Sequence, residues 1–451
     1  MRISTLTTIT FVLLQAGYLL AWTTPERVDR RPEGYVVYLH DIAIGRGGTP
    51  SVVWSECKSG TCYEKIMFSR RAGDTWTVPL NISRDSGDIR TPAIALDANG
   101  YPIVVWSEES YARMRYVHFL GDTWSLPKPC FPYTGITPRL ASDCRGRVHL
   151  LYEDLASHGG IWYSYYLPIP DSWTTPTRVA LGAGELGWSS LAVDRFDHLH
   201  AVWMDYGTNG LSYAHNDGAG WSAPSPLPDP APDDQSCEPR IAVDTLARPH
   251  VVWQERSGDY WLYYSGRDAD SWSSPRRLTP QSSGPPVVCS DSLSKVYVLY
   301  GWYDGLRCIV RTDTAWSAPE RISDTTAMQE VASDGRLVHV IWRSADRSLY
   351  YSNNGVPGVG EAPSTGSPPV SFRVETPMGL LVVRFSLSAT SRVVLSVFDP
   401  TGRRALERDL GTLSVGVHSI SVDADSLVAG QYIGVLSTNV GRHVTKIVIA
   451  R

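Results

Sequence analysis

Seven short stretches of the chain carry apolar residues at consecutive positions and end in an aromatic residue, as in SVVW, HAVW and HVVW. Their final aromatic residues are Trp54, Trp106, Tyr152, Trp203, Trp253, Tyr300 and Trp342. A strand with one solvent-facing side alternates apolar and polar residues, whereas a strand buried on both faces does not. These stretches therefore predict strands that are covered on both sides.

A second phrase, W-x-x-P, alternates with the first and begins at Trp22, Trp76, Trp124, Trp173, Trp221, Trp272 and Trp316, a mean spacing of 49 residues. Because proline lacks a backbone donor, we place this phrase on the outer edge strand of a sheet. One unit, residues 238–279, divides into four short strands without helical periodicity. Repeated four-stranded units with buried inner strands predict an all-β protein whose residues 22–355 form a β-propeller.

The two ends of the repeat region complement each other. The last unit, residues 329–355, has three predicted strands and no W-x-x-P phrase, whereas the phrase at Trp22 has only the fourth strand. We therefore expect the strand at 22–28 to pair with the strand near 349–352. That pairing would close a ring of seven blades.

The turn before several W-x-x-P phrases resembles the Asp box of sialidase-type propellers, S-x-D-x-G-x-x-W. Ser69, Gly73 and Trp76 match it, with Arg71 at the Asp position, and other copies are more degenerate. The resemblance implies a sialidase-like propeller. It implies sialidase activity only weakly, because that family needs three arginines, a Tyr–Glu pair and an acidic catalyst, and the sequence places no such pair by motif.

Arg2 and the apolar stretch from Ile9 to Leu20 indicate a signal peptide over residues 1–21. We therefore expect a secreted chain, and no later segment is apolar enough over 18 residues to span a membrane. Cys57 and Cys62 flank a turn-like insert and are the best candidates for a disulfide. The remaining cysteines show no spacing typical of a zinc site, so no metal is predicted.

A Pro/Gly/Ser-rich linker at residues 356–370 precedes a change of pattern. Residues 371–451 alternate better and predict a small immunoglobulin-like β-sandwich. Their motifs resemble the C-terminal sorting domain of type IX secretion in Gram-negative bacteria, although the usual opening P-N-P is absent. The matching residues are Asp399, Gly402, Arg403, Gly416, Leu427, Gly430, Tyr432 and Lys446. The resemblance implies the type IX secretion machinery as a partner, and a secreted or outer cell-surface location.

Composition narrows the function. The 451 residues include 19% charged residues with a net charge of -5 and no basic stripe, which argues against nucleic acid as a partner. The 16 Trp and 23 Tyr suit surfaces that contact sugars. No cofactor motif is present, and we expect a monomer.

Acidic residues follow the second strands, and arginines lie near the start of the first strands. The set comprises Arg90, Arg139, Arg240, Glu56, Glu108, Glu153, Asp205 and Glu255. On one face of a propeller these side chains would ring the mouth of the central channel. There they would bind a polar ligand such as a glycan, or act as paired carboxylates in glycoside hydrolysis. Because the set repeats around the ring, we favour ion pairs between blades over either role.

Four histidines, His149, His200, His250 and His339, also repeat, each five or six residues after an Asp, and we interpret them as structural. The leading hypothesis is a secreted or cell-surface propeller that binds a glycan or a protein ligand. Its rivals are a sialidase-like glycoside hydrolase and a non-catalytic scaffold or adhesin.

Overall fold

The computed structural model describes residues 22–355 and most of 373–449. The gaps in the first range are 46, 61–63, 85–86, 109–112, 155–159, 182–184, 231–233, 280–282, 303–304 and 313–314. Those in the second are 376–379, 388–389, 400–402, 415, 424–426, 428–429 and 439–440. The chain divides into two compact units, Met1–Gly358 and Val359–Arg451. Every described regular element is a strand, so these residues include no helix that is long and apolar enough to cross a membrane.

Within the described part of the first unit, the strands form seven antiparallel sheets of four or five strands. The first sheet contains β2 (Tyr35–Ile44), β3 (Pro50–Lys58), β4 (Glu64–Ala72), β5 (Thr75–Trp76) and β6 (Leu80–Asn81). The second contains β7 (Ile89–Leu96), β8 (Pro102–Glu108), β9 (Arg113–His118) and β10 (Lys128–Pro129). The third contains β11 (Ile136–Ser142), β12 (Val148–Asp154), β13 (Gly160–Leu167), β14 (Ser172–Trp173) and β15 (Thr177–Leu181).

The next four sheets follow in chain order. They are β16 (Leu186–Val193), β17 (Leu199–Asp205), β18 (Gly210–Asn216) and β19 (Ser225–Pro226); β20 (Gln235–Val243), β21 (Pro249–Ser257), β22 (Asp259–Asp268), β23 (Ser271–Trp272) and β24 (Arg276–Arg277); β25 (Val287–Ser290), β26 (Val296–Trp302), β27 (Gly305–Thr312), β28 (Ala315–Trp316) and β29 (Glu320–Ser323); and β30 (Met328–Ser333), β31 (Val338–Arg343), β32 (Leu349–Asn353) and β1 (Glu26–Arg27).

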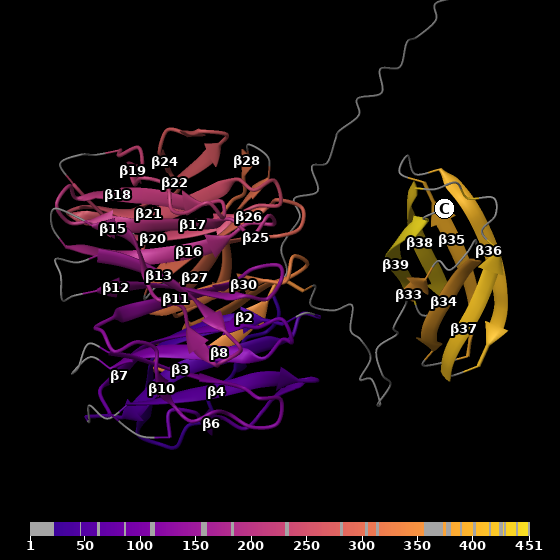
Figure 1. Ribbon diagram of the computed structural model, residues 1–451, viewed down its shortest axis with the longest axis horizontal. Coiled ribbons are helices and arrows are strands. Elements are labelled where there is room, and N and C mark those ends of the chain that lie inside the picture. The colour runs from indigo at the N-terminus through magenta and orange to yellow at the C-terminus, as the bar shows by residue number, and fades with distance from the viewer. Residues whose placement is uncertain are drawn as a thin grey trace, which may run out of the picture. The chain divides into compact units, whose positions relative to one another are not determined.

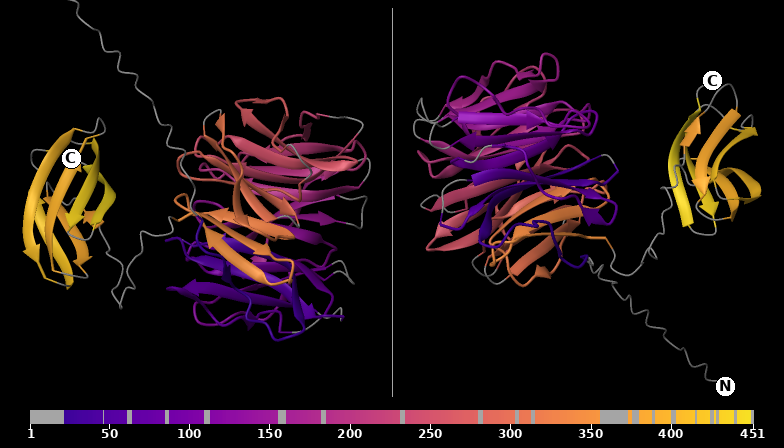
Figure 2. Two further views of the ribbon diagram at one scale, coloured as in Figure 1. Left: turned by 180° about the vertical axis from the view of Figure 1, so that it is seen from behind. Right: turned by 90° about the horizontal axis from the view of Figure 1, so that it is seen from below.

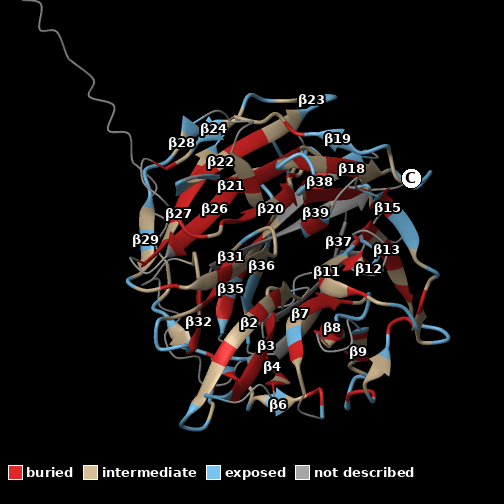
Figure 3. Ribbon diagram, turned by 90° about the vertical axis from the view of Figure 1, so that its left-hand side faces the viewer, coloured by how far each residue is buried: buried red, intermediate tan, exposed pale blue. Residues whose placement is uncertain are grey.

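The first strands of the sheets meet around a common centre. Each contacts the first strand of the next sheet, from β2 through β7, β11, β16, β20 and β25 to β30, and β30 contacts β2 again. The sheets radiate outward from this ring (Figures 1 and 3), and the short fourth strands lie at their outer edges, as the prolines predict. This arrangement is that of a β-propeller.

The second strands are buried on both faces, as their apolar runs predict. In β3 every residue but the last is buried, and the closing aromatic, Trp54, is fully buried. Neighbouring sheets share these cores, so that Val53 of β3 packs in one cluster with Val104 of β8. Burying a Trp removes about 150–250 Å² from water, which is worth roughly 4–6 kcal/mol as an upper estimate. Burial of apolar surface therefore stabilises the stacked sheets most where these strands meet.

The N-terminal strand joins the last sheet. Glu26 and Arg27 of β1 pair with Tyr351 and Tyr350 of β32, and Val28 N donates to Leu349 O at 2.8 Å. The predicted pairing of these two segments is confirmed. Figure 2 shows the indigo strands of the β2 sheet beside the orange strands of this last sheet.

The repeated histidines are structural, and their main partner is a tyrosine. His149 Nδ1 lies 2.8 Å from the Tyr163 hydroxyl on the third strand, and His200, His250 and His339 make the same contact at 2.7–2.8 Å with Tyr213, Tyr264 and Tyr351. The predicted Asp partners are farther away, at 3.3–3.5 Å for the first three histidines. Each His therefore links the second strand to the third within its own sheet.

The second unit contains two antiparallel sheets in its described residues. One is β33 (Arg373–Glu375), β34 (Leu380–Leu387) and β37 (Gly416–Asp423). The other is β36 (Arg404–Leu413), β35 (Ser391–Phe398), β38 (Gly430–Thr438) and β39 (Gly441–Ile449). Val393, Leu395 and Val397 alternate with more exposed residues along β35 and are fully buried.

Candidate functional site

The first strands carry a repeated irregularity next to the centre of the ring. In β2, β7, β11, β16 and β20 the register with the second strand shifts by a bulge. In four of these bulges one residue adopts a positive φ of 45–53°, namely Thr91, Thr137, Trp188 and Glu238. A non-glycine residue is strained there, and a bulge redirects side chains from the strand's regular alternation. The bulges turn Trp188 and Glu238 toward the cavity described next.

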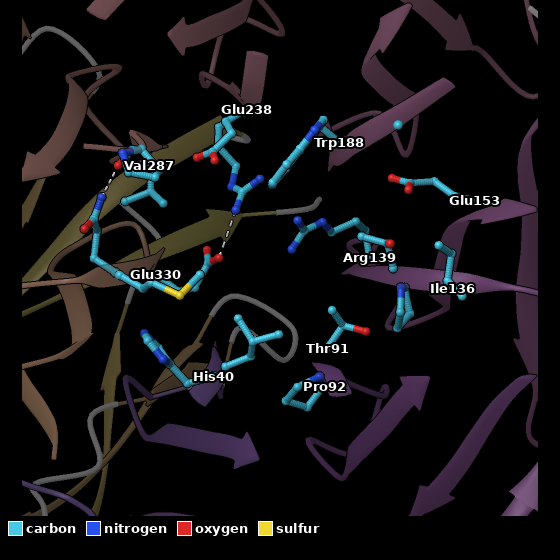
Figure 4. Close-up of a pocket in the computed structure, with 18 of the residues that line it drawn as sticks. His40, Thr91, Pro92, Ile136, Arg139, Glu153, Trp188, Glu238, Val287 and Glu330 are labelled. Atoms are coloured by element: carbon cyan, nitrogen blue, oxygen red, sulfur yellow. Dashed lines mark hydrogen bonds and ion pairs between the residues drawn. The ribbon is translucent and has the colours of Figure 1, made fainter. Parts of the chain in front are cut away.

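A cavity of about 400 Å³ opens at the centre of the ring on the bulged side of the first strands. Its wall includes Arg139, Trp188, Glu238, Arg240 and Glu330, which come from four different sheets. Figure 4 shows Arg139, Trp188, Glu238 and Glu330 around this hollow.

The charged groups of the cavity break the symmetry of the ring. Each second strand ends its apolar run in the repeated aromatic residue. The residue just before that aromatic pairs with one residue of the first strand. These equivalent residues are Asp41, Ala93, Arg139, Ser190, Arg240, Val287 and Glu330. Four of the seven are ionisable, so this layer is not the same in every sheet.

The two arginines of this layer face acids and each other. Arg240 Nη2 lies 3.1 Å from Glu330 Oε1, and Arg139 Nε donates to Ser189 O at 3.0 Å. Burial lowers the pKa of Arg139, and the nearby charge of Arg240 lowers it further. The guanidinium groups are thus close enough to repel each other, and the surrounding carboxylates offset that repulsion.

The carboxyl groups of the cavity are held in defined positions. Glu153 Oε1 accepts hydrogen bonds from Ser189 N at 3.0 Å and Ser189 Oγ at 3.1 Å. Burial raises the pKa of Glu153 and of Glu238. Asp41, at the equivalent position of β2, does not line the cavity, and burial and the charge of Glu330 raise its pKa. Several of these groups therefore hold a proton more readily than a carboxyl in water.

An aromatic surface faces these charges. Trp188 is 41% exposed, and its indole Nε1 donates to the Tyr206 hydroxyl at 2.6 Å. Both side chains line the cavity. The indole is therefore fixed at its edge while its face stays accessible.

Some buried polar atoms of the wall have no hydrogen-bond partner in the protein. They include both ring nitrogens of His40, Arg240 Nη1 and Gln329 Oε1. Burial lowers the pKa of His40 to about 3, so its ring is neutral at ordinary pH. A buried polar atom without a partner costs about 1–3 kcal/mol, so these atoms reduce the stability of the wall.

The structure brings three of the eight predicted site residues into this cavity: Arg139, Arg240 and Glu153. The other five do not line it. Arg90 lies 3.5 Å from Asp88 and 4.0 Å from Glu64 on the neighbouring sheet, and Glu108 pairs with Arg115 at 2.8 Å. Only the Arg90–Glu64 contact joins two sheets, as the interpretation as ion pairs between blades requires, because Glu108 and Arg115 lie in the same sheet.

The remaining acids follow the second strands, one strand away from the centre. Glu56 accepts from Trp54 Nε1 at 3.0 Å, and Glu255 accepts from Trp253 Nε1 at 3.0 Å and from Ser236 Oγ at 2.9 Å. Asp205 Oδ1 accepts from Gly207 N at 2.9 Å in the following turn. The sequence reasoning missed Trp188, Glu238 and Glu330. An alignment of the first strands would have placed Glu330 level with Arg139 and Arg240, but no sequence signal marks the bulges at Trp188 and Glu238.

The predicted disulfide and the question of a metal site concern residues outside this cavity. Cys62 lies outside the described residues, so its pairing with Cys57 stays a prediction. Within the described ranges no group of three or more His, Cys, Asp or Glu side chains is arranged to hold a metal ion.

The sorting-motif residues fall in the second unit. Asp399 Oδ1 accepts from Arg403 N at 3.0 Å in the turn after β35, and Gly402 lies outside the described residues. Leu427 and Tyr432 are buried, Gly416 begins β37, Gly430 begins β38 and Lys446 lies in β39.

No family model matches the sequence, and no curated protein matches it. Three solved structures are similar in fold. An ulvan lyase of polysaccharide lyase family PL25, bound to a -[GlcA(1-4)Rha3S]- saccharide, has 11% identity and a TM-score of 0.53 over 71% of this chain and 95% of its own. The polysaccharide lyase Uly1 has 10% identity and a TM-score of 0.50 over 69% and 88%. A fungal alcohol oxidase of the AA5 family, in complex with copper, has 12% identity and a TM-score of 0.51 over 95% and 99%. At these identities the likeness supports the β-propeller fold.

Proposed function

We propose that the chain is a secreted or cell-surface, seven-bladed β-propeller that binds a glycan in its central cavity. The observation that carries this proposal is the meeting of an accessible indole face with charged and polar side chains on the wall of one cavity. A sugar offers both complements, since its C–H face stacks on an aromatic ring and its hydroxyls donate and accept hydrogen bonds.

The individual groups have distinct roles in this proposal. Trp188 provides the stacking surface, with Tyr206 holding its edge. Arg240 donates to a sugar oxygen, and Glu238 and Gln329 accept from hydroxyls. A guanidinium ringed by carboxylates suits hydroxyl recognition, because its charge is already balanced. The ulvan lyase noted above is bound to a saccharide, so a related fold accommodates such a ligand.

A glycan array probed with the full chain tests the proposal, followed by titration of each positive glycan. We expect Trp188→Ala to weaken binding about tenfold, the loss of one aromatic–sugar contact of roughly 1.4 kcal/mol. Phe196→Ala is the matched control, because Phe196 is 55% exposed in the turn between β16 and β17. Equal binding by Trp188→Ala and the parent chain would place the ligand elsewhere.

A sialidase-like glycoside hydrolase is the second candidate, and the position of Glu153 favours it. A buried carboxyl with a raised pKa suits a general acid. Two of the three predicted arginines lie in the cavity, and Tyr206 lies near Glu153, since both side chains come within 3.7 Å of a Cβ built on Gly187. However, burial raises the pKa of Tyr206, which opposes a role as nucleophile. Cleavage of fluorogenic glycosides that is abolished by Glu153→Gln would establish hydrolysis.

We further propose that residues 371–451 form a β-sandwich that acts as a type IX sorting domain, after removal of a signal peptide at residues 1–21. The motif matches and the separate compact unit support this proposal. Deleting residues 371–451 should trap the propeller in the periplasm of a host with this secretion system. Unchanged export would refute the sorting role. If the chain folds and is exported but binds no glycan, the hypothesis of a non-catalytic scaffold or adhesin would be favoured.

A further inference from the structure

A second hollow of about 590 Å³ lies away from the central cavity, beside β12 and β13. Tyr152, Asp154 and Trp162 line it from these two strands, and Tyr133 and Thr134 line it from the segment that leads into β11. The residues that line it are largely aromatic side chains, prolines and threonines. None of them is Lys or Arg, so the hollow differs chemically from the central cavity.

The register of the two strands places the key side chains on one face. Tyr152 pairs directly with Trp162, and Asp154 pairs with Gly160. A Cβ atom at Gly160 would lie 2.8 Å from Trp162 Nε1, so the indole lies over the glycine. The missing side chain leaves room for the indole, on the face of the sheet that also carries Asp154.

The aromatic rings are held at graded exposure. Tyr152 is buried and stacks on Phe131, with ring centroids 5.4 Å apart and planes inclined by 26°. Tyr133 is 62% exposed, and Trp162 has intermediate exposure. A buried ring thus anchors the floor while two accessible rings form the walls. Thr134 Oγ1 donates to Asp154 Oδ1, which fixes the polar edge.

The position of Trp162 varies from sheet to sheet. Trp162 pairs with Tyr152, the repeated aromatic of its second strand, and each of the other sheets has an equivalent residue. These residues are Met67, Arg115, Ser212, Tyr263, Arg307 and Tyr350. Tyr263 and Tyr350 stack on Trp253 and Trp342 at the same position, so the β11–β15 sheet differs from these two only in carrying the larger Trp there.

We propose that this hollow is a second saccharide-binding site that takes a neutral sugar unit, with Tyr133 and Trp162 stacking on its ring and Asp154 accepting from its hydroxyls. The part of the lining that the structure describes holds one carboxylate and no Lys or Arg, which disfavours an acidic sugar. The site does not depend on the central cavity for its chemistry. Glu153, between Tyr152 and Asp154 in β12, lines that cavity instead, so the strand separates the two sites.

Titration of the full chain with neutral oligosaccharides of three to six units, in gluco, manno, xylo and galacto series, tests the site. Intrinsic tryptophan fluorescence and calorimetry report binding. We expect at least one series to bind, and Tyr133→Ala and Trp162→Ala each to weaken it about tenfold. Phe196→Ala should leave this binding unchanged.

The variants separate the two proposed sites. Because Tyr133 is largely exposed, Tyr133→Ala keeps the fold and remains informative if Trp162→Ala misfolds. Binding that survives both substitutions, or no binding by any neutral series, would overturn the second site. Loss in Trp188→Ala alone would assign the ligand to the central cavity, which would also overturn the second site while supporting the proposed function.

Discussion

Arg240 of β20 and Glu330 of β30 form an ion pair at 3.1 Å although their strands are not neighbours in the ring. The β25 strand contacts both β20 and β30 and carries Val287 at the equivalent position. A small apolar side chain there leaves room for the long side chains to meet across the cavity. The pair therefore ties two separated sheets together at the wall of the proposed glycan site.

A double-mutant cycle measures this tie. Both side chains are mostly buried, with exposures of 18% and 21%, so their interaction is screened less than a surface pair. We expect Arg240→Gln and Glu330→Gln to couple by about 1–2 kcal/mol in the free energy of unfolding, above the median for exposed pairs. Chemical denaturation of the four proteins gives the value. A coupling below about 0.3 kcal/mol would show that the contact contributes nothing to stability.

Glu255 should make stability depend on pH. Burial raises its pKa to about 7 from 4.5, despite the hydrogen bonds from Trp253 and Ser236. Between these values the folded state binds more protons than the unfolded state, so stability falls as pH rises from about 4.5 to 7. Glu255→Gln removes this term, and its stability should exceed that of the parent by on the order of 1–2 kcal/mol at pH 8 and by little at pH 4.

Thermal unfolding across pH 4–8 checks this behaviour, with Glu33→Gln as the control at an exposed carboxyl. The control should shift stability equally at all pH values. A constant difference between Glu255→Gln and the parent would show that the carboxyl titrates alike in both states.

The β-propeller was predictable because its constraints repeat. Trp54 and its counterparts are buried between sheets in every unit, so the same apolar run recurs and the doubly buried strand is readable. The pairing of Glu26 with Tyr351 was predictable too. The last unit lacked a fourth strand, and the N-terminus carried a fourth strand without the other three. Such packing rules produce the same sequence pattern in each copy of the repeat.

The site was predicted only in part because its residues obey no repeat. Trp188 and Glu238 face the cavity through bulges with positive φ, and no sequence rule for alternating strands reveals a bulge. Glu56 and Glu255 repeat and looked like rim residues, but the indole of the preceding Trp binds each one inside the sheet. Tyr133 lies in the segment before β11 and Trp162 lies in β13, and only the fold places them together.

The tyrosine that holds each repeated histidine should contribute to stability. In Tyr213→Phe the buried His200 Nδ1 loses its partner at 2.8 Å, while the ring packing is preserved. We expect a loss of about 1–2 kcal/mol, the penalty for leaving one buried polar atom unsatisfied. Denaturant unfolding measures it, with exposed Tyr133→Phe as the control. A loss no larger than the control's would assign the histidine to another partner.

Closure of the ring by β1 gives the sharpest test of the seven-bladed arrangement. Val28 is fully buried in a core shared by β3 and β32, whereas Val78, near the outer edge of the first sheet, is 76% exposed. Val28→Asp places an unpaired charge in that core and should destabilise the chain by about 3 kcal/mol or more, while Val78→Asp changes stability by less than about 0.5 kcal/mol. Hydrogen exchange should show the loss first in β32 and β2, which flank the closure. Equal stability of the two variants would mean that the N-terminal strand does not hold the ring closed in solution.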